Sequence, residues 1–139
     1  MKDIIVFGHK NPDTDSIAAS ISYGYLLKQL GEDVESCALG QASDEAKFAL
    51  DKFGLEAPRV IEQAKGEANK VALVDHNEFQ QSVSDIADVT VLAVVDHHRI
   101  ANFETANPLY YRAEPVGCTS TILYKLYQEY EAEIPHAIA

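Results

Sequence analysis

The chain has 139 residues, a length that suits one domain, and 47% of them are hydrophobic, which is enough to form a core of its own. Its net charge of −11, with lysine and arginine scattered rather than clustered, argues against duplex DNA or RNA as a partner. No apolar run reaches the roughly 18 residues of a membrane-spanning helix and the apolar start is too short for a signal peptide, so we expect a cytoplasmic protein without a membrane partner.

The predicted elements alternate between strands and helices along the chain. Residues 3–8 form an apolar run rich in β-branched side chains, which predicts a buried strand. The next segment, 16–30, has apolar residues at helical spacing, and Gly31 is a natural stop. The remaining predicted elements, in chain order, are a strand at 34–39, a helix at 43–53 capped by Ser43, a strand at 70–74, a weaker helix at 79–87, strands at 89–95 and 108–113, and a helix at 119–131.

The fold class follows from the character of the strands. They are apolar throughout instead of alternating between apolar and polar residues, as strands buried on both faces are. Together with the intervening helices they predict an α/β fold, a parallel β-sheet with helices on both faces, over a single domain of residues 1–139. Cys37 and Cys118 lie far apart and outside any CxxC pair, so we expect two free thiols.

Acidic residues and histidines follow three of the predicted strands directly. They are His9, Asp13 and Asp15 after the first strand, Asp75 and His76 after 70–74, and Asp96, His97 and His98 at the end of 89–95. Because ligands of parallel α/β sheets bind beyond the carboxyl ends of the strands, we expect these side chains to meet in one place. Carboxylates and imidazoles together are typical ligands of divalent metal ions.

Each of these residues has a plainer interpretation when it is taken alone. A single aspartate after a strand is usually a turn former, and either Asp13 or Asp15 could simply cap the helix that begins nearby. The combination at three strand ends favours a metal site, and its ligand types suit Mn²⁺, Co²⁺ or Fe²⁺ better than Ca²⁺ or structural zinc. Two cations about 3.5–4 Å apart can share a hydroxide and clamp a phosphoryl group. Asp75, on the middle strand end, is the expected bridge between them.

Three segments carry a resemblance to a known family. GHKNPDTDS at 8–16, VDHNE at 74–78 and DHHRI at 96–100 resemble the DHH phosphoesterase superfamily, and more closely the manganese-dependent family II inorganic pyrophosphatases. The stretch 102–119 is also similar to that family. The resemblance covers essentially the whole chain and implies a Rossmann-like domain of a hydrolase. The implied reaction is hydrolysis of pyrophosphate to two phosphates, with a metal-bridging hydroxide as the nucleophile.

The resemblance also implies a ligand set for two Mn²⁺ ions per subunit, with Co²⁺ as a substitute and Mg²⁺ accompanying the substrate. His9 and Asp13 would bind one metal, and Asp15 and His97 would bind the other. Asp75 would bridge the two, in agreement with its position on the middle strand end.

Further roles follow from the same resemblance. His98 would face the substrate phosphate as a hydrogen-bond donor or proton source and would form the catalytic set with Asp75. Asp96 would orient a histidine without touching a metal. No role follows for His76. The family also implies a homodimer built through this domain.

The family pattern extends beyond this sequence. It continues past residue 139 into a helix with one more metal-binding aspartate, and then into a smaller domain whose Arg-Lys-Lys cluster grips the substrate. We therefore expect the chain to be the metal-binding N-terminal part, with the C-terminal substrate-binding domain absent, and to be weakly active or inactive alone.

Other functions remain open at this point. One is a DHH-type phosphodiesterase or exopolyphosphatase acting on oligonucleotides, cyclic dinucleotides or short polyphosphates. Another, of a different class, is a non-catalytic metal-binding or dimerisation module. A purely structural α/β domain would require the acids and imidazoles at three strand ends to be a coincidence.

Overall fold

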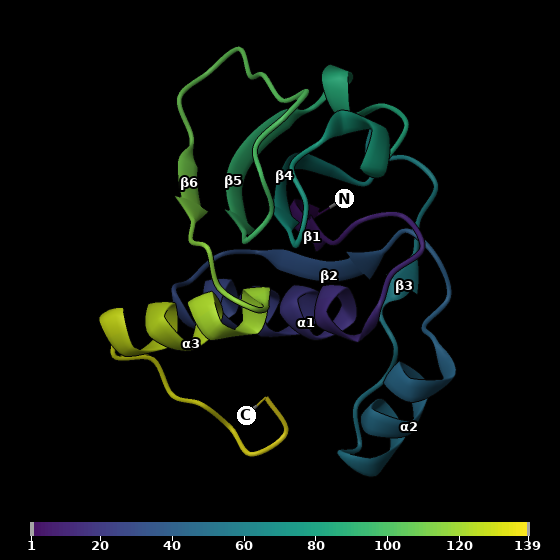
Figure 1. Ribbon diagram of the computed structural model, residues 1–139, viewed down its shortest axis with the longest axis vertical. Helices are drawn as coiled ribbons and strands as arrows, with labels where there is room; N and C mark the ends of the chain where they lie inside the picture. The colour runs from purple at the N-terminus through teal and green to yellow at the C-terminus, as the bar shows by residue number, and fades with distance from the viewer. Residues whose placement is uncertain (1, 139) are drawn as a thin grey trace.

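The computed structural model describes residues 2–138 and is built around a six-stranded sheet (Figure 1). The strands are β1 Lys2–Phe7, β2 Val34–Ala38, β3 Arg59–Val60, β4 Ala68–Val74, β5 Thr90–Asp96 and β6 Tyr110–Ala113. All neighbours pair in parallel, in the order β3-β2-β1-β4-β5-β6. The chain thus builds outward from β1 in two directions, and the order reverses between β1 and β4. This is the doubly wound arrangement, whose ligands bind at that reversal.

The all-parallel sheet with its helices confirms the predicted α/β class, but α-helices cover one face of the sheet and not both as predicted. The helices are α1 Thr14–Gln29, α2 Asp44–Lys52 and α3 Thr119–Glu129, with two 3₁₀ turns, η1 Phe79–Gln81 and η2 Ile86–Asp88. The helices α1 and α3 lie side by side over one face, as Figure 1 shows, and pack against each other. The opposite face is covered by the two 3₁₀ turns and the loops around them. Helix α2 packs beside α1 at the β2 end of the sheet.

The two apolar layers follow from the alternation of side chains along each strand. In β1, Ile4 and Val6 point to the layer that α1 and α3 cover, while Ile5 and Phe7 point to the other layer. All four are at most 1% exposed. Fully burying a side chain of this size contributes roughly 1.5–3 kcal/mol, so both faces of this central strand hold the sheet in place.

The helix predicted at 79–87 is wrong, because the chain forms η1 and η2 there with a break between them. Between the two turns, at residues 82–85, polar side chains form hydrogen bonds with other parts of the protein. The Ser82 hydroxyl lies 2.9 Å from Nε2 of His76, and the Asp85 carboxylate accepts backbone N–H groups from residues 64 and 65. Serine and aspartate compete in this way with helical hydrogen bonds.

The structure also contains the predicted helix cap and the two predicted free thiols. The predicted N-cap of α2 is present, since the Ser43 side chain accepts the N–H of Ala46. Cys37 and Cys118 are free, as expected. Among the described residues, no helix combines the length and the apolar character that crossing a membrane requires.

Candidate metal centre

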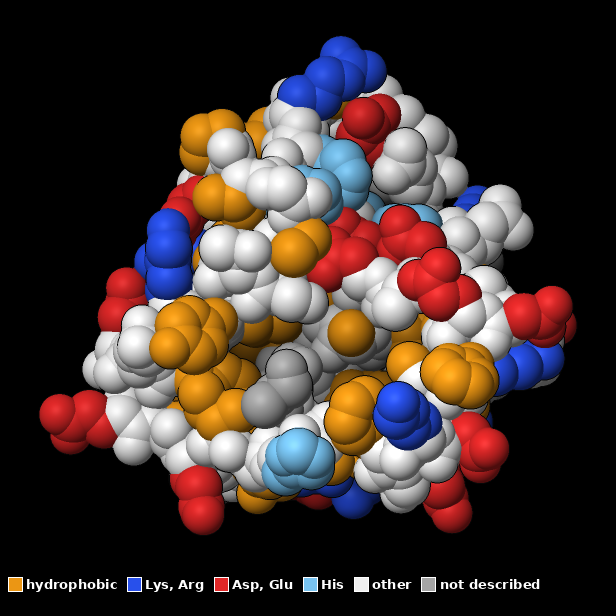
Figure 2. Space-filling view, turned by 60° about the horizontal axis from the view of Figure 1, so that its bottom comes forward, with side chains coloured by type: hydrophobic (Ala, Val, Ile, Leu, Met, Phe, Trp, Pro, Cys, Tyr) orange, Lys and Arg blue, Asp and Glu red, His pale blue; other side chains and the backbone are white. Residues whose placement is uncertain are grey.

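The three strand ends that carry acids and histidines belong to neighbouring strands at the middle of the sheet. His9 follows β1, Asp75 follows β4, and Asp96 to His98 close β5. The side chains therefore meet where the strand order reverses, between the beginnings of α1 and α3. Figure 2 shows acidic and histidine side chains gathered at one place on the surface, beside an apolar hollow.

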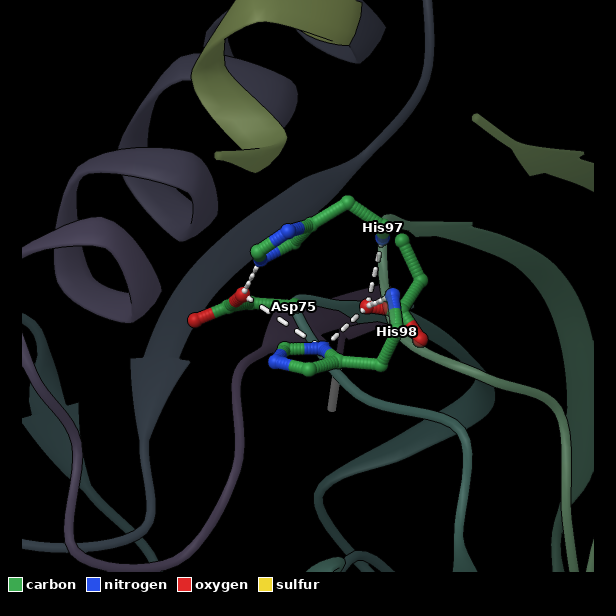
Figure 3. A group of neighbouring side chains, drawn as sticks. Asp75, His97 and His98 are labelled. Carbon is green, nitrogen blue, oxygen red and sulfur yellow. Dashed lines mark hydrogen bonds and ion pairs between the residues drawn. The ribbon is translucent and has the colours of Figure 1, made fainter. Parts of the chain in front are cut away.

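Asp75 lies at the centre of this group. Its side chain is almost fully buried, and its two oxygens face different histidines. Oδ2 lies 3.3 Å from Nε2 of His9. Oδ1 lies 2.9 Å from Nε2 of His97, and Figure 3 shows these two side chains facing each other. Oδ1 also accepts a hydrogen bond from the Thr119 hydroxyl at 3.2 Å. Asp75 therefore joins the two histidines in one group of side chains.

The electrostatics around Asp75 are unfavourable to its ionised form. Burial raises the pKa of Asp75, the hydrogen bond with His9 lowers it, and the neighbouring carboxylates of Asp15 and Asp13 raise it again, with a net increase. The hydrogen bond to Asp75 in turn raises the pKa of His9 to about 9, against the lowering effect of burial. A cluster with this surplus of carboxylates would be stabilised by added positive charge.

His9 and Asp13 form the first side of the group. Nε2 of His9 lies 3.7 Å from Oδ1 of Asp13, while Nδ1 lies 2.6 Å from the carbonyl oxygen of Lys10. The backbone N–H of His9 donates to the Ser16 hydroxyl at 3.0 Å. Asp13 is also the N-cap of α1, since it accepts the N–H of Ser16 at 2.9 Å. The capping interpretation of Asp13 and its place in the group are therefore both true.

Asp15 approaches the second side of the group from α1. Its Oδ2 lies 3.7 Å from Nε2 of His97, so the structure brings the two predicted partners together. The same carboxylate accepts the backbone N–H groups of Thr119 and Ser120, at 2.9 and 3.3 Å, and the Ser120 hydroxyl at 3.1 Å. It thus lies at the N-terminus of α3, where free N–H groups stabilise an anion.

Asp96 is held by groups of the protein itself. Its Oδ1 accepts the backbone N–H groups of His97 and His98, and lies 2.7 Å from Nδ1 of His98. Its Oδ2 accepts from the side chain of Asn77 at 2.8 Å. Burial would raise the pKa of Asp96, but the hydrogen bonds from Asn77 and His98 outweigh it and keep the pKa below its usual range.

His76 lies outside the group. Its ring is fully buried, with Nδ1 2.9 Å from the Val74 carbonyl oxygen and Nε2 2.9 Å from the Ser82 hydroxyl. Burial lowers the pKa of His76 to about 4, which keeps the ring neutral. It therefore ties the loop before η1 to the end of β4.

Two sets of side chains have ligand atoms that lie within 4.8 Å of one another, and Asp75 belongs to both. One set is His9, Asp13 and Asp75, and the other is Asp75, Asp96, His97 and His98. Imidazole nitrogens mixed with carboxylate oxygens, without thiolates, fit Mn²⁺, Fe²⁺ or Co²⁺ by donor type. The residues present therefore fit divalent cations by donor type, and Asp75 is common to both sets.

Some contacts of the site could not be read from the sequence. Thr119, Ser120 and Asn77 all bind carboxylates of the group, and only Asn77 lies next to one of the acids and histidines that follow the predicted strands. Thr119 and Ser120 lie more than 100 residues after Asp15, at the start of a helix that was predicted without any role in the site.

Comparisons with known proteins identify the family to which the chain is similar. A family model described as "DHH family, N-terminal domain" matches residues 3–139. Proteins named "Probable manganese-dependent inorganic pyrophosphatase" from Enterococcus faecalis and an Exiguobacterium species are 66% and 61% identical over 100% and 96% of the chain. The match covers 45% and 43% of their own lengths, so the chain spans less than half of these relatives.

Solved structures with the same architecture are also found. One is a Methanococcus jannaschii protein described as a "putative family II inorganic pyrophosphatase", with a TM-score of 0.87 and 38% identity over 97% of this chain and 44% of that one. Another is an "exopolyphosphatase-related protein" from Bacteroides fragilis, with a TM-score of 0.65 over 92% of this chain and 39% of that one. At 18% identity the second shows a shared fold alone.

Proposed function

The chain belongs to the DHH family, and we propose that it is the metal-binding N-terminal domain of a manganese-dependent inorganic pyrophosphatase. The observation that carries a two-cation site is Asp75, a buried carboxylate with one oxygen toward His9 and the other toward His97. The substrate is supported by the names of relatives that are 59–66% identical over nearly the whole chain.

The proposed ligands of one cation are His9, Asp13 and Asp75, and those of the other are Asp75, Asp15 and His97. Asp15 is preferred to Asp96 because Oδ2 of Asp15 lies beside His97 and has one hydrogen-bond donor, Thr119. The carboxylate of Asp96 lies against His98 instead, with three donors on Oδ1 and one on Oδ2. We assign two Mn²⁺ per subunit, with Co²⁺ as a substitute and Mg²⁺ as the companion of the substrate.

Cations at these positions would lower the pKa of water and neutralise charge on phosphoryl oxygens. The protein's own contribution on the substrate side is His98. Its ring is 47% exposed and is held through Nδ1 by Asp96, which leaves Nε2 to donate a hydrogen bond or a proton to a phosphate. Asp75 and His98 are thus the proposed catalytic residues, and Asp96 orients His98 without touching a metal.

The substrate requires more positive charge than this domain provides. The chain carries 11 lysines and arginines against 22 acids, and its relatives are more than twice as long. We propose that the remaining substrate contacts come from a further domain in the longer proteins. The 139-residue chain should then turn over pyrophosphate weakly or not at all alone.

The proposed assembly is a homodimer in the cytoplasm. β6 is an edge strand, with backbone groups available for another strand. Tyr110 on β6, Tyr124 on α3 and Tyr130 directly after α3 are exposed on this side. We therefore assign this side of the sheet to a second copy, and sedimentation as a monomer would contradict the assignment. Free cysteines agree with a reducing compartment, and the acidic chain agrees with a protein that binds no nucleic acid or membrane.

The test is pyrophosphate hydrolysis with Mn²⁺ by the chain extended to the length of its relatives. Turnover should fall to background in Asp75→Ala and persist in Asp88→Ala, because Asp88 is an exposed aspartate outside the group. Strong turnover by the 139-residue chain alone would contradict the need for a further domain. Hydrolysis of dinucleotides but not of pyrophosphate would move the function to a phosphodiesterase.

A further inference from the structure

Asn77 is a buried amide that the ligand set leaves without a role. Its side chain is 1% exposed, two residues after Asp75. Nδ2 donates to Oδ2 of Asp96 at 2.8 Å and to the carbonyl oxygen of Arg99 at 2.7 Å. Oδ1 accepts the backbone N–H of Ala101 at 3.0 Å. The two donors and one acceptor in use join the end of β4 to the loop that follows β5.

Asn77 fixes the orientation of the Asp96 carboxylate, and Asp96 in turn holds the ring of His98. With Oδ2 held by Asn77, the carboxylate presents Oδ1 to the backbone of residues 97 and 98 and to Nδ1 of His98 at 2.7 Å. Asp96 is fully buried, so rotating it would leave an ionised group without its hydrogen bonds, which is costly. The carboxylate therefore has one favourable orientation as long as Asn77 is in place.

The orientation of Asp96 determines which nitrogen of His98 carries the proton. A carboxylate accepts hydrogen bonds, so Nδ1 of His98 is the donor, and the neutral ring then offers Nε2 as an acceptor or, once protonated, as a second donor. If that carboxylate is not in place, no hydrogen bond favours the tautomer of neutral His98 with the proton on Nδ1. Asn77 does not contact the ring, so any effect on His98 must act through Asp96.

We propose that Asn77 is a positioning residue for His98: it fixes the Asp96 carboxylate, which keeps the His98 proton on Nδ1 and directs Nε2 to the substrate phosphate. The part that concerns substrate rests on the proposed function, whereas the part that concerns the ring proton does not. If the role of Asn77 were purely structural, it would hold residues 99–101 without affecting which nitrogen of His98 carries the proton.

The test compares Asn77→Asp with Asn69→Asp. Asn69 is an exposed residue of β4 whose Nδ2 donates to Oδ1 of Asp3 at 3.3 Å. Each change removes an amide donor from an aspartate and adds a carboxylate beside it, but only the first touches Asp96. The first readout is the ¹⁵N spectrum of the His98 ring in the metal-free 139-residue chain, at a pH where the ring is neutral.

The wild type and Asn69→Asp should show the proton on Nδ1, and Asn77→Asp should show it shifted to Nε2. The second readout is turnover with Mn²⁺ in the chain extended to the length of its relatives. Disturbing a partner of this kind typically costs about 10–100-fold in activity, so Asn77→Asp should lower kcat by that factor with a smaller change in KM. Asn69→Asp should leave both constants unchanged.

A folded Asn77→Asp protein that keeps the proton on Nδ1 would overturn the proposal, and circular dichroism establishes that it is folded. If this variant does not fold, the same spectrum of Asn77→Ser decides, because serine is too short to hold both Asp96 and residues 99–101. Failure of the extended wild type to hydrolyse pyrophosphate would overturn the proposed function alone, since the spectrum needs no substrate.

Discussion

Asp75 is constrained at the backbone as well as at the side chain. Its φ angle of 59° lies in the left-handed region, which residues other than glycine rarely adopt. Such a conformation costs on the order of 1–3 kcal/mol, so the surrounding contacts must maintain it. Its backbone N–H donates to the Val95 carbonyl oxygen at 3.0 Å, which helps to hold the turn at the end of β4.

Thr119 offers a direct measure of how strongly the protein holds Asp75. Both side chains are buried, and the Thr119 hydroxyl donates to the carboxylate. Thr119→Val keeps the shape but removes the donor, and should lower the free energy of unfolding of the metal-free chain by about 2 kcal/mol. Urea denaturation in the presence of a chelator measures this change.

The matched control for that change is Thr121→Val, two residues along the same helix. Thr121 is exposed, and its hydroxyl lies 3.4 Å from the Cys118 sulfur. Its replacement should change the unfolding free energy by less than about 0.5 kcal/mol. An equal decrease in unfolding free energy in both variants would mean that the hydrogen bond from Thr119 to Asp75 does not stabilise the protein.

At the scale of elements, the link between β1 and α1 depends on Gly8. A Cβ atom at this position would lie 1.8 Å from the Ser16 hydroxyl oxygen and 3.2 Å from the Ser16 Cα, which belongs to the backbone of α1. Gly8→Ala would therefore push the helix away from the strand and disturb the hydrogen bond between the Ser16 hydroxyl and His9.

We predict that Gly8→Ala lowers the unfolding free energy by roughly 1–3 kcal/mol or more, as overpacking of a close contact does. Gly117→Ala is the control, because a Cβ at Gly117 meets no atom within 4 Å. Gly117→Ala should have the stability of the wild type in thermal or urea unfolding. A Gly8→Ala protein as stable as Gly117→Ala would show that α1 moves freely against β1.

The sequence predicts best those elements whose own residues decide their structure. The strands β1, β4 and β5 were located within one or two residues, because continuous apolar runs bounded by polar residues leave few alternatives. β3 was not predicted, since it has only two residues and is held by its pairing with β2 and by side chains outside the strand. Arg59 in β3 pairs with Glu35 at 3.0 Å and with Glu67 at 2.6 Å.

In the site, too, the features that follow from local sequence were predicted, and those that depend on packing between elements were not. The convergence of His9, Asp75 and His97 follows from strands that end alike in a parallel sheet, and this was predicted. The support that α3 gives to Asp15 depends on how α3 packs against α1, which residue spacing does not encode. The ligand roles themselves stay predictions, because the geometry brings the side chains together without identifying what they hold.

At the scale of the whole molecule, the layers on the two faces of the sheet support the candidate metal centre in different ways. The face covered by α1 and α3 places two helix N-termini beside the strand ends, near Asp13 and Asp15. The other face, covered by η1 and η2, ties the end of β4 in place through His76. The candidate metal centre therefore lies where both layers and the reversal of strand order meet.

The most direct test of the central claim is the number of Mn²⁺ ions bound per chain, measured by calorimetry with the purified 139-residue protein. We predict two ions for the wild type and for Asp88→Asn, and fewer than two for Asp75→Asn, because the shared carboxylate has lost its charge. An Asp75→Asn protein that binds two ions with unchanged affinity, or a folded wild type that binds none, would contradict a centre built around Asp75.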